Sequence, residues 1–237
     1  MNKGMLIEDI FGNKYRLSII MKDRVDTYLH QGKRKQLIEL LKSKGFKDKA
    51  VLNAMERVPR HSFLDSIFLS SAYDDIAFPI GEGQTISHPA TVACQTELLN
   101  LKKGEKVLEI GTGCGYQTAV LLEMGAKVFT IERQFKLFEK TRVLLPSLGY
   151  NARFLYGDGY KGLPAHAPFD KIIVTAGAPS IPEALLLQLR ENGGLLIIPV
   201  GENNEQVMNR VIRKNGTEFE KTELGKFKFV PLLKNKV

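Results

Sequence analysis

The sequence predicts a doubly wound α/β fold with a mixed sheet, and three observations support this prediction. From about residue 101 onward, short apolar runs alternate with amphipathic segments, a pattern typical of βαβ units and a mainly parallel sheet. A glycine-rich stretch at residues 111–115 joins the first apolar run to an amphipathic segment. Nearer the C-terminus, an Asn-Gly pair at residues 215 and 216 separates two strand-like runs, which indicates an antiparallel hairpin. We therefore expect five parallel strands followed by an antiparallel edge.

Taken in chain order, the elements divide the sequence into three parts. Residues 1–21 have no clear periodicity and stay unassigned as an N-terminal extension. A single domain is expected over 22–237, and its helical N-terminal part, 22–100, has mostly helical periodicity. The sheet region, 101–237, contains the expected parallel strands 106–110, 127–131, 152–156, 171–176 and 195–200. Helices are expected between them over 116–124, 134–148 and 182–190, the last opened by Pro182 and closed by Gly193.

The composition excludes several classes of protein. With 237 residues, 43% of them hydrophobic, the chain can bury a core of ordinary size, so a mainly disordered chain is excluded. It contains no long apolar run and no apolar signal-peptide region near the N-terminus, so we expect a cytoplasmic protein without a membrane partner. The two cysteines lack CxxC spacing and the four histidines are scattered, so we expect neither a disulfide framework nor a metal site.

The net charge of +8 is concentrated near the N-terminus. Residues 1–60 carry 14 Lys and Arg against 7 Asp and Glu, whereas the rest of the chain is nearly balanced. The excess lies mainly on residues 30–50, where Leu37, Leu40 and Leu41 keep helical spacing and lysines occupy the other face. Aromatic residues do not alternate with these charges as a strand-binding groove requires. We therefore interpret the segment as a solvated helix face and expect no nucleic-acid partner.

The most informative segment is the glycine loop in "KVLEIGTGCGYQTAVL". Gly111, Gly113 and Gly115 follow a strand and precede a helix, so the loop can turn sharply and bring its backbone amides to a ligand at the helix N-terminus. Glu132 lies 21 positions after Gly111, at the end of the second strand, where its carboxylate can accept from both hydroxyls of a ribose. A purely structural glycine turn is the alternative, and the combination of strand, loop, helix and acids favours the nucleotide site.

The loop favours S-adenosylmethionine over a dinucleotide. A dinucleotide loop has the pattern GxGxxG, but Tyr116 stands where the third glycine would be. Glu109, two residues before Gly111, would repel a phosphate but suits an aminoacyl group that carries an ammonium. S-adenosylmethionine has this group and a ribose, and it has no phosphate. Asp158 and Gly159 follow the third strand, where Asp158 either accepts from an adenine amino group or forms an Asp-Gly turn.

The polar stretch "GEGQTISHP", residues 81–89, precedes a segment with helical periodicity. We interpret it as a loop that leads into a capped helix. Ser87 has two interpretations here: it is the N-cap of the helix that has Pro89 in its first turn, or it is an active-site residue. The local sequence alone favours capping.

Several segments together resemble the protein-L-isoaspartate O-methyltransferase family: "RVPRHSF", "AYDDIAFPIGEGQTISHP", "VLEIGTGCGYQTAVL", "GDGYKGLPAHAPFDKIIVTAGAP", "LLIIPVG" and "FVPLL". The resemblance covers roughly residues 25–233, and "PIGEGQTIS" is specific to this family. It implies the Rossmann-like fold of class I S-adenosylmethionine-dependent methyltransferases. It also implies methyl transfer to the free α-carboxylate of L-isoaspartyl residues in damaged proteins and peptides, with S-adenosylhomocysteine as the product and repair through a succinimide.

The resemblance also implies roles for residues. By it, Ser87 is the active-site residue, and Gln84, Thr85 and Ile86 line the cofactor and substrate region. An isoaspartyl carboxylate has a pKa of ~3.5 and is ionised at pH 7, so neither a general base nor a metal ion is required. Cys114 departs from the serine that relatives often carry at its position, and a thiol is a poorer hydrogen-bond donor.

Two other functions stay open at this point. One is a methyltransferase of the same fold that acts on a small molecule or an RNA. The other is a non-catalytic binding protein that keeps the cofactor loop. Of the three hypotheses we take isoaspartyl repair as our prediction, carried out by a monomeric cytoplasmic enzyme without nucleic-acid or membrane partners.

Overall fold

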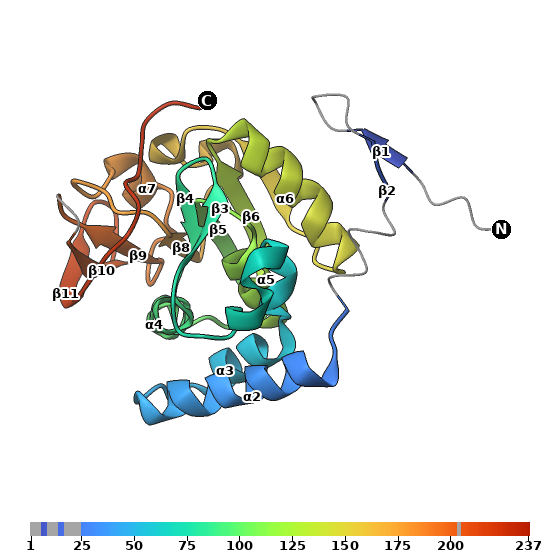
Figure 1. The fold of residues 1–237 in the computed structure, drawn as a ribbon. Helices are drawn as coiled ribbons and strands as arrows, with labels where there is room; N and C mark the ends of the chain where they lie inside the picture. The colour runs from blue at the N-terminus through green and yellow to red at the C-terminus, as the bar shows by residue number, and fades with distance from the viewer. Residues whose placement is uncertain (1–5, 9–13, 17–24, 203–204) are drawn as a thin grey trace.

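The computed structural model describes residues 6–8, 14–16, 25–202 and 205–237 (Figure 1). A seven-stranded mixed sheet has the strand order β11-β10-β9-β8-β5-β6-β7. Its parallel strands are β5 (Lys106–Ile110), β6 (Lys127–Glu132), β7 (Arg153–Tyr156), β8 (Lys171–Val174) and β9 (Leu195–Val200). Its antiparallel edge is formed by β10 (Gln206–Arg213) and β11 (Phe219–Phe227). The predicted fold class is confirmed.

Helices cover both faces of this sheet. Because side chains alternate along a strand, Val107 and Leu108 of β5 point to opposite faces. Val107 packs in one core cluster with Leu99 of α4 and Leu121 of α5, and Leu108 packs in another with Leu185 of α7. The helices are α2 (Tyr28–Ser43), α3 (Lys49–Arg57), α4 (Pro89–Leu99), α5 (Tyr116–Glu123), α6 (Phe135–Ser147) and α7 (Glu183–Leu187). Short 3₁₀ turns are η1 (Arg60–Phe63), η2 (Ser66–Ser71), η3 (Gly159–Lys161) and η4 (Pro164–His166).

Two elements are shorter than the sequence predicts. β8 ends at Val174 because the chain then turns toward the C-terminal segment, where Gly177 N donates to Val230 O at 2.8 Å. The helix expected over 182–190 ends at Leu187. Its last expected turn is lost because Arg190 N donates to Phe169 O at 2.7 Å, which draws the chain alongside the segment before β8.

The helical N-terminal part and the sheet region share one hydrophobic core. Leu41 of α2 and Ala54 of α3 belong to the same buried cluster as Tyr116 of α5 and Leu145 of α6. The predicted buried face of α2 is confirmed for Leu37 and Leu41, whereas Leu40 is 40% exposed. Figure 1 shows α2 and α3 packed below the sheet, next to α5.

Two small hairpins lie outside the main sheet. β1 (Leu6–Glu8) pairs with β2 (Lys14–Arg16) in the extension that the sequence left unassigned, most of which lies outside the described residues. β3 (Phe78–Gly81) pairs with β4 (Gln84–Ile86), so the loop expected over 81–89 is a hairpin in its first half. Within the described ranges, no helix is both long and apolar enough to cross a membrane.

The strand order predicts a binding site at the carboxyl ends of the parallel strands. β5 pairs with β6 on one side and with β8 on the other, so the chain direction of the crossovers reverses beside β5. In open parallel sheets, ligands bind outside the carboxyl ends of the strands at such a switch point. The loops that follow β5, β6 and β8 therefore form the expected location of the site.

Candidate active site

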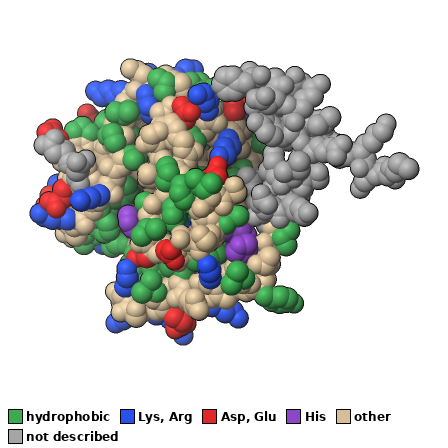
Figure 2. Space-filling view, in the orientation of Figure 1, with side chains coloured by type: hydrophobic (Ala, Val, Ile, Leu, Met, Phe, Trp, Pro, Cys, Tyr) green, Lys and Arg blue, Asp and Glu red, His purple; other side chains and the backbone are tan. Residues whose placement is uncertain are grey.

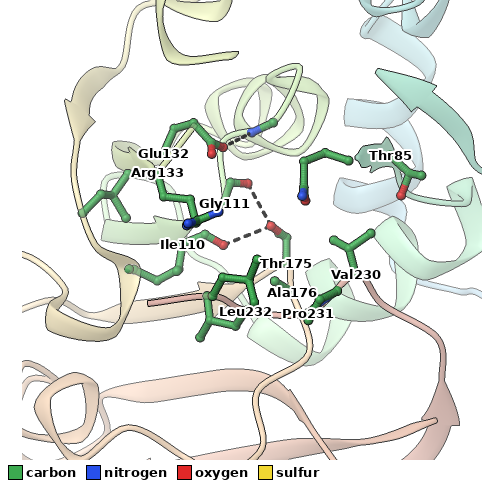
Figure 3. A pocket seen from close by; sticks show the side chains of 15 residues that line it. Thr85, Ile110, Gly111, Glu132, Arg133, Thr175, Ala176, Val230, Pro231 and Leu232 are labelled. Carbon is green, nitrogen blue, oxygen red and sulfur yellow. Dashed lines mark hydrogen bonds between the residues drawn. The ribbon is translucent and has the colours of Figure 1, made fainter. Parts of the chain in front are cut away.

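Three pockets with shared lining residues lie at the carboxyl ends of the parallel strands. The first, here called the large pocket, is shown in Figure 3; it is lined by Gln84, Thr85, Ile110, Gly111, Gly113, Ile131, Glu132, Arg133, Gly159, Thr175, Ala176, Val230, Pro231, Leu232 and Leu233. The loop pocket is lined by Thr85, Ile86, Ser87, Val92, Gly111, Thr112, Gly113, Cys114, Tyr116, Gln117 and Thr175. The rim pocket is lined by Ala77, Thr85, Ser87, His88, Thr91, Thr175, Lys228, Phe229 and Val230. Thr85 and Thr175 line all three, so the pockets form one cleft.

Glu132 fixes the glycine loop from the end of β6. Its carboxylate accepts from Gly113 N and from Gln134 N, both at 2.9 Å, and the residue is 5% exposed on the wall of the large pocket. Gly111 has a φ of 96°, and a Cβ there would lie 2.5 Å from Thr175 Oγ1, so the turn requires glycine. Three predicted cofactor residues, Gly111, Gly113 and Glu132, therefore meet at the large pocket.

Gly115 packs against α6, on the side of the loop away from the pockets. Its φ is 91°, and a Cβ there would lie 2.7 Å from Leu145 Cδ1 and 2.8 Å from Thr141 Cγ2, so glycine allows α5 to pack against α6. In a dinucleotide loop, the third glycine has this packing role. Here Gly115 takes it, one position before Tyr116, where the third glycine of the dinucleotide pattern would stand. Gly115 is therefore placed outside the pocket lining, unlike the other two glycines of the loop.

The amides of the three loop glycines do not face a ligand, contrary to our expectation. They donate to Ile131 O, to the Glu132 carboxylate and to Thr112 O, at 2.9 Å in each case. The amides of Cys114 and Tyr116 face the Cys114 sulfur, and in the part of the chain that the structure describes no acceptor is found for the amide of Gln117, which lines the loop pocket. The N-terminus of α5, rather than the glycines, thus offers a donor to an anionic group through Gln117 N.

Glu109 also departs from its predicted role. It is fully buried on the face of β5 that packs against α5, where Thr118 Oγ1 donates to its Oε2 at 2.5 Å. Burial raises the pKa of the Glu109 carboxyl to about 7, because the charged form loses its hydration. Since Glu109 lies outside the lining of the three pockets, the predicted direct contact with an ammonium is not formed in this geometry.

Asp158 forms the Asp-Gly turn that was the alternative interpretation. Its Oδ1 accepts from Tyr160 N at 2.9 Å and its Oδ2 from Asn235 N at 3.0 Å. Gly159, the next residue, lines the large pocket. The loop after β7 therefore reaches the cleft through Gly159, while Asp158 holds the turn and the C-terminal segment.

The β3–β4 hairpin supplies the other predicted site residues. Gln84 and Thr85 line the large pocket, and Thr85, Ile86 and Ser87 line the loop pocket. Ser87 also lines the rim pocket. The structure thus brings all four residues to the cleft, with Ser87 on the boundary between two pockets.

The capping interpretation of Ser87 is wrong. The N-cap of α4 is His88, whose side chain makes no capping bond. Instead, Asp75 Oδ1 accepts from Ala90 N at 2.8 Å, and Asp75 Oδ2 pairs with Lys44 Nζ at 2.5 Å. Across the described ranges, the Ser87 hydroxyl has no hydrogen-bond partner, so it is available to a ligand.

A buried arginine holds the Ser87 segment in place. Arg60 Nη2 donates to Ser87 O at 2.9 Å and to Ile76 O at 3.2 Å, and Arg60 Nε donates to Ala72 O at 3.1 Å. The guanidinium carbon lies 4.9 Å from the centre of the Tyr116 ring, which also lines the loop pocket. Burial lowers the pKa of Arg60 from its ordinary value. The arginine therefore connects the N-terminal part to the cleft through main-chain carbonyls.

Sequence reasoning missed two parts of the site. Thr175 follows β8, and its hydroxyl donates to Gly111 O at 2.8 Å and to Ile110 O at 3.0 Å. Residues 230–233 line the large pocket, held there because Leu232 N donates to Gly177 O at 2.7 Å. Thr175 could have been found from its place at the carboxyl end of a strand next to the switch point.

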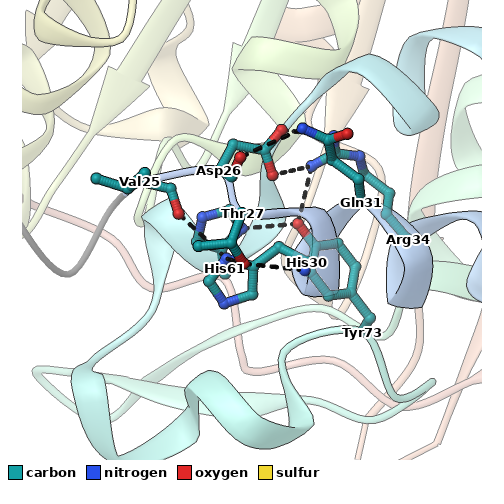
Figure 4. Close-up of polar contacts among 8 residues, drawn as sticks. All are labelled: Val25, Asp26, Thr27, His30, Gln31, Arg34, His61 and Tyr73. Atoms are coloured by element: carbon teal, nitrogen blue, oxygen red, sulfur yellow. Dashed lines mark hydrogen bonds and ion pairs between the residues drawn. The ribbon is translucent and has the colours of Figure 1, made fainter.

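One group of potential metal ligands lies apart from the cleft lining (Figure 4). Ligand atoms of Asp26, His30 and His61 lie within 4.8 Å of one another, so the expectation of scattered histidines is wrong for this pair. The two imidazole rings stack with centroids 3.9 Å apart and 20° between their planes, so one ion cannot lie in the plane of both. Asp26 is paired with Arg34 through bonds of 3.1 and 2.8 Å. The geometry is that of a ring stack and an ion pair.

Comparisons with known proteins agree on one family. The family model described as Protein-L-isoaspartate(D-aspartate) O-methyltransferase matches residues 32–237. A protein-L-isoaspartate O-methyltransferase from Flavobacterium psychrophilum is 62% identical over 212 residues, which cover 89% of this chain and 99% of the relative. One from Christiangramia forsetii is 59% identical over the same shares. A Plasmodium falciparum structure assigned to this enzyme, in complex with S-adenosyl-L-homocysteine, superposes with a TM-score of 0.74 at 32% identity, covering 85% of this chain and 99% of that one.

Proposed function

Because the chain belongs to the protein-L-isoaspartate(D-aspartate) O-methyltransferase family, we propose that the cleft carries out that family's reaction. The chain is an S-adenosylmethionine-dependent carboxyl O-methyltransferase. It transfers a methyl group to the free carboxylate of L-isoaspartyl residues in damaged proteins and peptides, which initiates repair through a succinimide.

The large pocket and the loop pocket fit the parts of S-adenosylmethionine. The Glu132 carboxylate has lone pairs beyond its two backbone bonds for ribose hydroxyls, and Ile110 and Ile131 provide apolar walls for a base. The unpaired Gln117 amide at the N-terminus of α5 suits the carboxylate of the aminoacyl group. When bound, the cofactor supplies a methyl group on a sulfonium, which needs no Lewis acid.

The residues of the cleft then have one task, which is to position the nucleophile. An isoaspartyl carboxylate is ionised at pH 7, since its pKa is ~3.5, so no proton has to be removed. The Ser87 hydroxyl lies between the loop pocket and the rim pocket and has no partner of its own among the described residues. We assign it as the donor that orients the carboxylate. Holding the reacting atoms at near-attack distance supplies the rate enhancement.

The observation that carries this proposal is that Ser87 lines both the loop pocket and the rim pocket. It is tested by offering labelled S-adenosylmethionine with an isoaspartyl peptide, a structured RNA and small carboxylic acids in parallel. We expect label in the peptide alone. Label in the RNA or in a small acid alone would support a methyltransferase with another substrate. If calorimetry detected no binding of S-adenosylmethionine, a non-catalytic protein would be supported instead.

Several expectations from the sequence remain predictions. These are the cytoplasmic location, the monomeric state and the lack of nucleic-acid and membrane partners. The single domain over 22–237 is also a proposal, and the core shared by Leu41, Ala54, Tyr116 and Leu145 supports it.

A further inference from the structure

Four lysines lie near the end of the chain, and three of them have partners. Lys226 Nζ lies 2.7 Å from Glu205 Oε2, Lys234 Nζ lies 5.5 Å from the centre of the Tyr160 ring, and Lys236 Nζ lies 5.0 Å from that of Tyr156. Lys228 is exposed, and the described part of the chain offers it no ion pair, hydrogen bond or ring contact. It lines the rim pocket. Its ammonium is therefore available at the entrance to the cleft.

The backbone on the C-terminal side of Lys228 is held firmly. Phe229 N donates to Gln206 Oε1 at 2.9 Å, and Val230 O accepts from Gly177 N at 2.8 Å. These bonds fix the position from which the lysine side chain extends. The ammonium can move over the rim, while its point of attachment cannot.

The rim pocket has a positive lining. Lys228 is its one lysine or arginine, His88 is its one other titratable side chain, and no carboxylate is among its described lining residues. Asp75, which accepts from Ala90 N at the start of the neighbouring α4, is already paired with Lys44. A carboxylate that enters this pocket thus meets an unpaired cation and no opposing acid, and the same pocket leads to Ser87.

We propose that Lys228 binds the isoaspartyl carboxylate at the rim pocket through an ion pair and so directs the carboxylate toward Ser87. This inference rests on the proposed function. As the new C–O bond forms and the S–C bond breaks, the carboxylate loses its negative charge and the sulfonium its positive charge. An ion pair with Lys228 is therefore stronger in the bound substrate than in the transition state, so it serves binding and does not accelerate the chemical step. The neutral ester is released because it no longer attracts the ammonium.

The proposal predicts which kinetic constant changes. In Lys228→Ala, KM for an isoaspartyl peptide rises about fivefold, as expected for an exposed ion pair at the upper end of its range. The turnover number and KM for S-adenosylmethionine stay within about twofold, because neither depends on capture. At high salt the difference in peptide KM disappears, since exposed charges are screened. Lys228→Arg keeps the low KM. Discrimination between isoaspartyl and aspartyl peptides is unchanged, because both carry a carboxylate.

Lys226→Ala is the matched control, since it removes the same charge from an exposed lysine two positions away that has its own partner. A second comparison uses the peptide whose α-carboxylate is replaced by a carboxamide, measured as a competitive inhibitor. Wild-type protein binds the acid more tightly than the amide, and Lys228→Ala reduces that preference.

Equal KM changes in the two lysine variants, or an unchanged acid-over-amide preference in Lys228→Ala, would overturn the inference. A wild-type protein that methylates no isoaspartyl peptide would instead overturn the proposed function, so the two failures are distinguishable.

Discussion

At the scale of single residues, the Ser87 hydroxyl has a role that the fold does not need. Because it has no hydrogen-bond partner within the described residues, Ser87→Ala should leave the melting temperature within about 1 °C of wild type. Loss of a hydrogen bond to a charged carboxylate should lower the turnover number about tenfold or more. Methyl-transfer kinetics and a thermal melt check both. The control is Ser66→Ala, which changes an exposed serine of η2. Full activity together with a lower melting temperature in Ser87→Ala would show that Ser87 has a structural role.

Glu109 is a second residue-scale feature, and it predicts a pH dependence of stability. Its pKa is raised from 4.5 to about 7 by burial, so folding favours the protonated form. Its contribution is fully present below pH 4.5 and is lost as the pH rises through about 7, a change of about 3 kcal/mol as an order of magnitude. Glu109→Gln cannot ionise and keeps an acceptor for Thr118. We expect the variant to gain stability over wild type from pH 5 to pH 8 in urea unfolding; a gap that does not change with pH would contradict the raised pKa.

At the scale of elements, α4 depends on a remote cap. Asp75 Oδ1 accepts from Ala90 N in the first turn, so Asp75→Ala should lower the free energy of unfolding by about 1–2 kcal/mol. Lys44→Ala removes only the ion pair with Asp75. Because the Lys44 side chain is half-exposed, this loss should lower the free energy of unfolding by less than about 1 kcal/mol. Urea titrations of the two variants separate cap from ion pair. Equal losses would show that the ion pair, and not the cap, carries the effect.

The C-terminal segment is an element that completes the large pocket. Arg133 Nε donates to Asn235 O at 2.8 Å and Phe135 N donates to Val237 O at 2.7 Å, which ties the tail to the end of β6 and the start of α6. Removal of residues 234–237 should release Leu233 from the pocket wall and raise KM for S-adenosylmethionine about fivefold, equivalent to about one hydrogen bond.

The double variant Lys234→Ala, Lys236→Ala is the control for that truncation. It removes the ring contacts of both lysines but keeps the main-chain bonds of the tail. It should therefore bind the cofactor like wild type. If the truncated protein and the double variant lost the same affinity, the side chains rather than the main chain would hold the pocket.

How far the elements could be predicted depended on how local their causes are. The strand–glycine loop–helix unit around Gly111 was predictable, because its turn, its periodicity and Glu132 lie within one short stretch. The cap of α4 was not, because a Ser-His-Pro sequence satisfies the local rule while the actual acceptor, Asp75, lies in a separate loop. The stacking of His30 on His61 was missed for the same reason, since contacts between distant segments leave no local pattern.

At the scale of the whole molecule, the fold class and most of the cleft followed from the sequence, but the direction of some side chains did not. Glu109 is next to the glycine loop in the sequence, yet the alternation of β5 turns it into the core. Thr175 and Lys228 enter the cleft from β8 and from the end of β11, and only the assembled sheet brings them beside Ser87. Tertiary packing, rather than local propensity, completes the site.

The cleft as a whole is proposed to serve methyl transfer to isoaspartyl carboxylates. The most direct test measures transfer of label from S-adenosylmethionine to a peptide with one isoaspartyl residue and to its aspartyl twin of the same sequence. We expect methyl ester on the isoaspartyl peptide and none on the twin. Equal labelling of the two peptides, or labelling of neither, would contradict it.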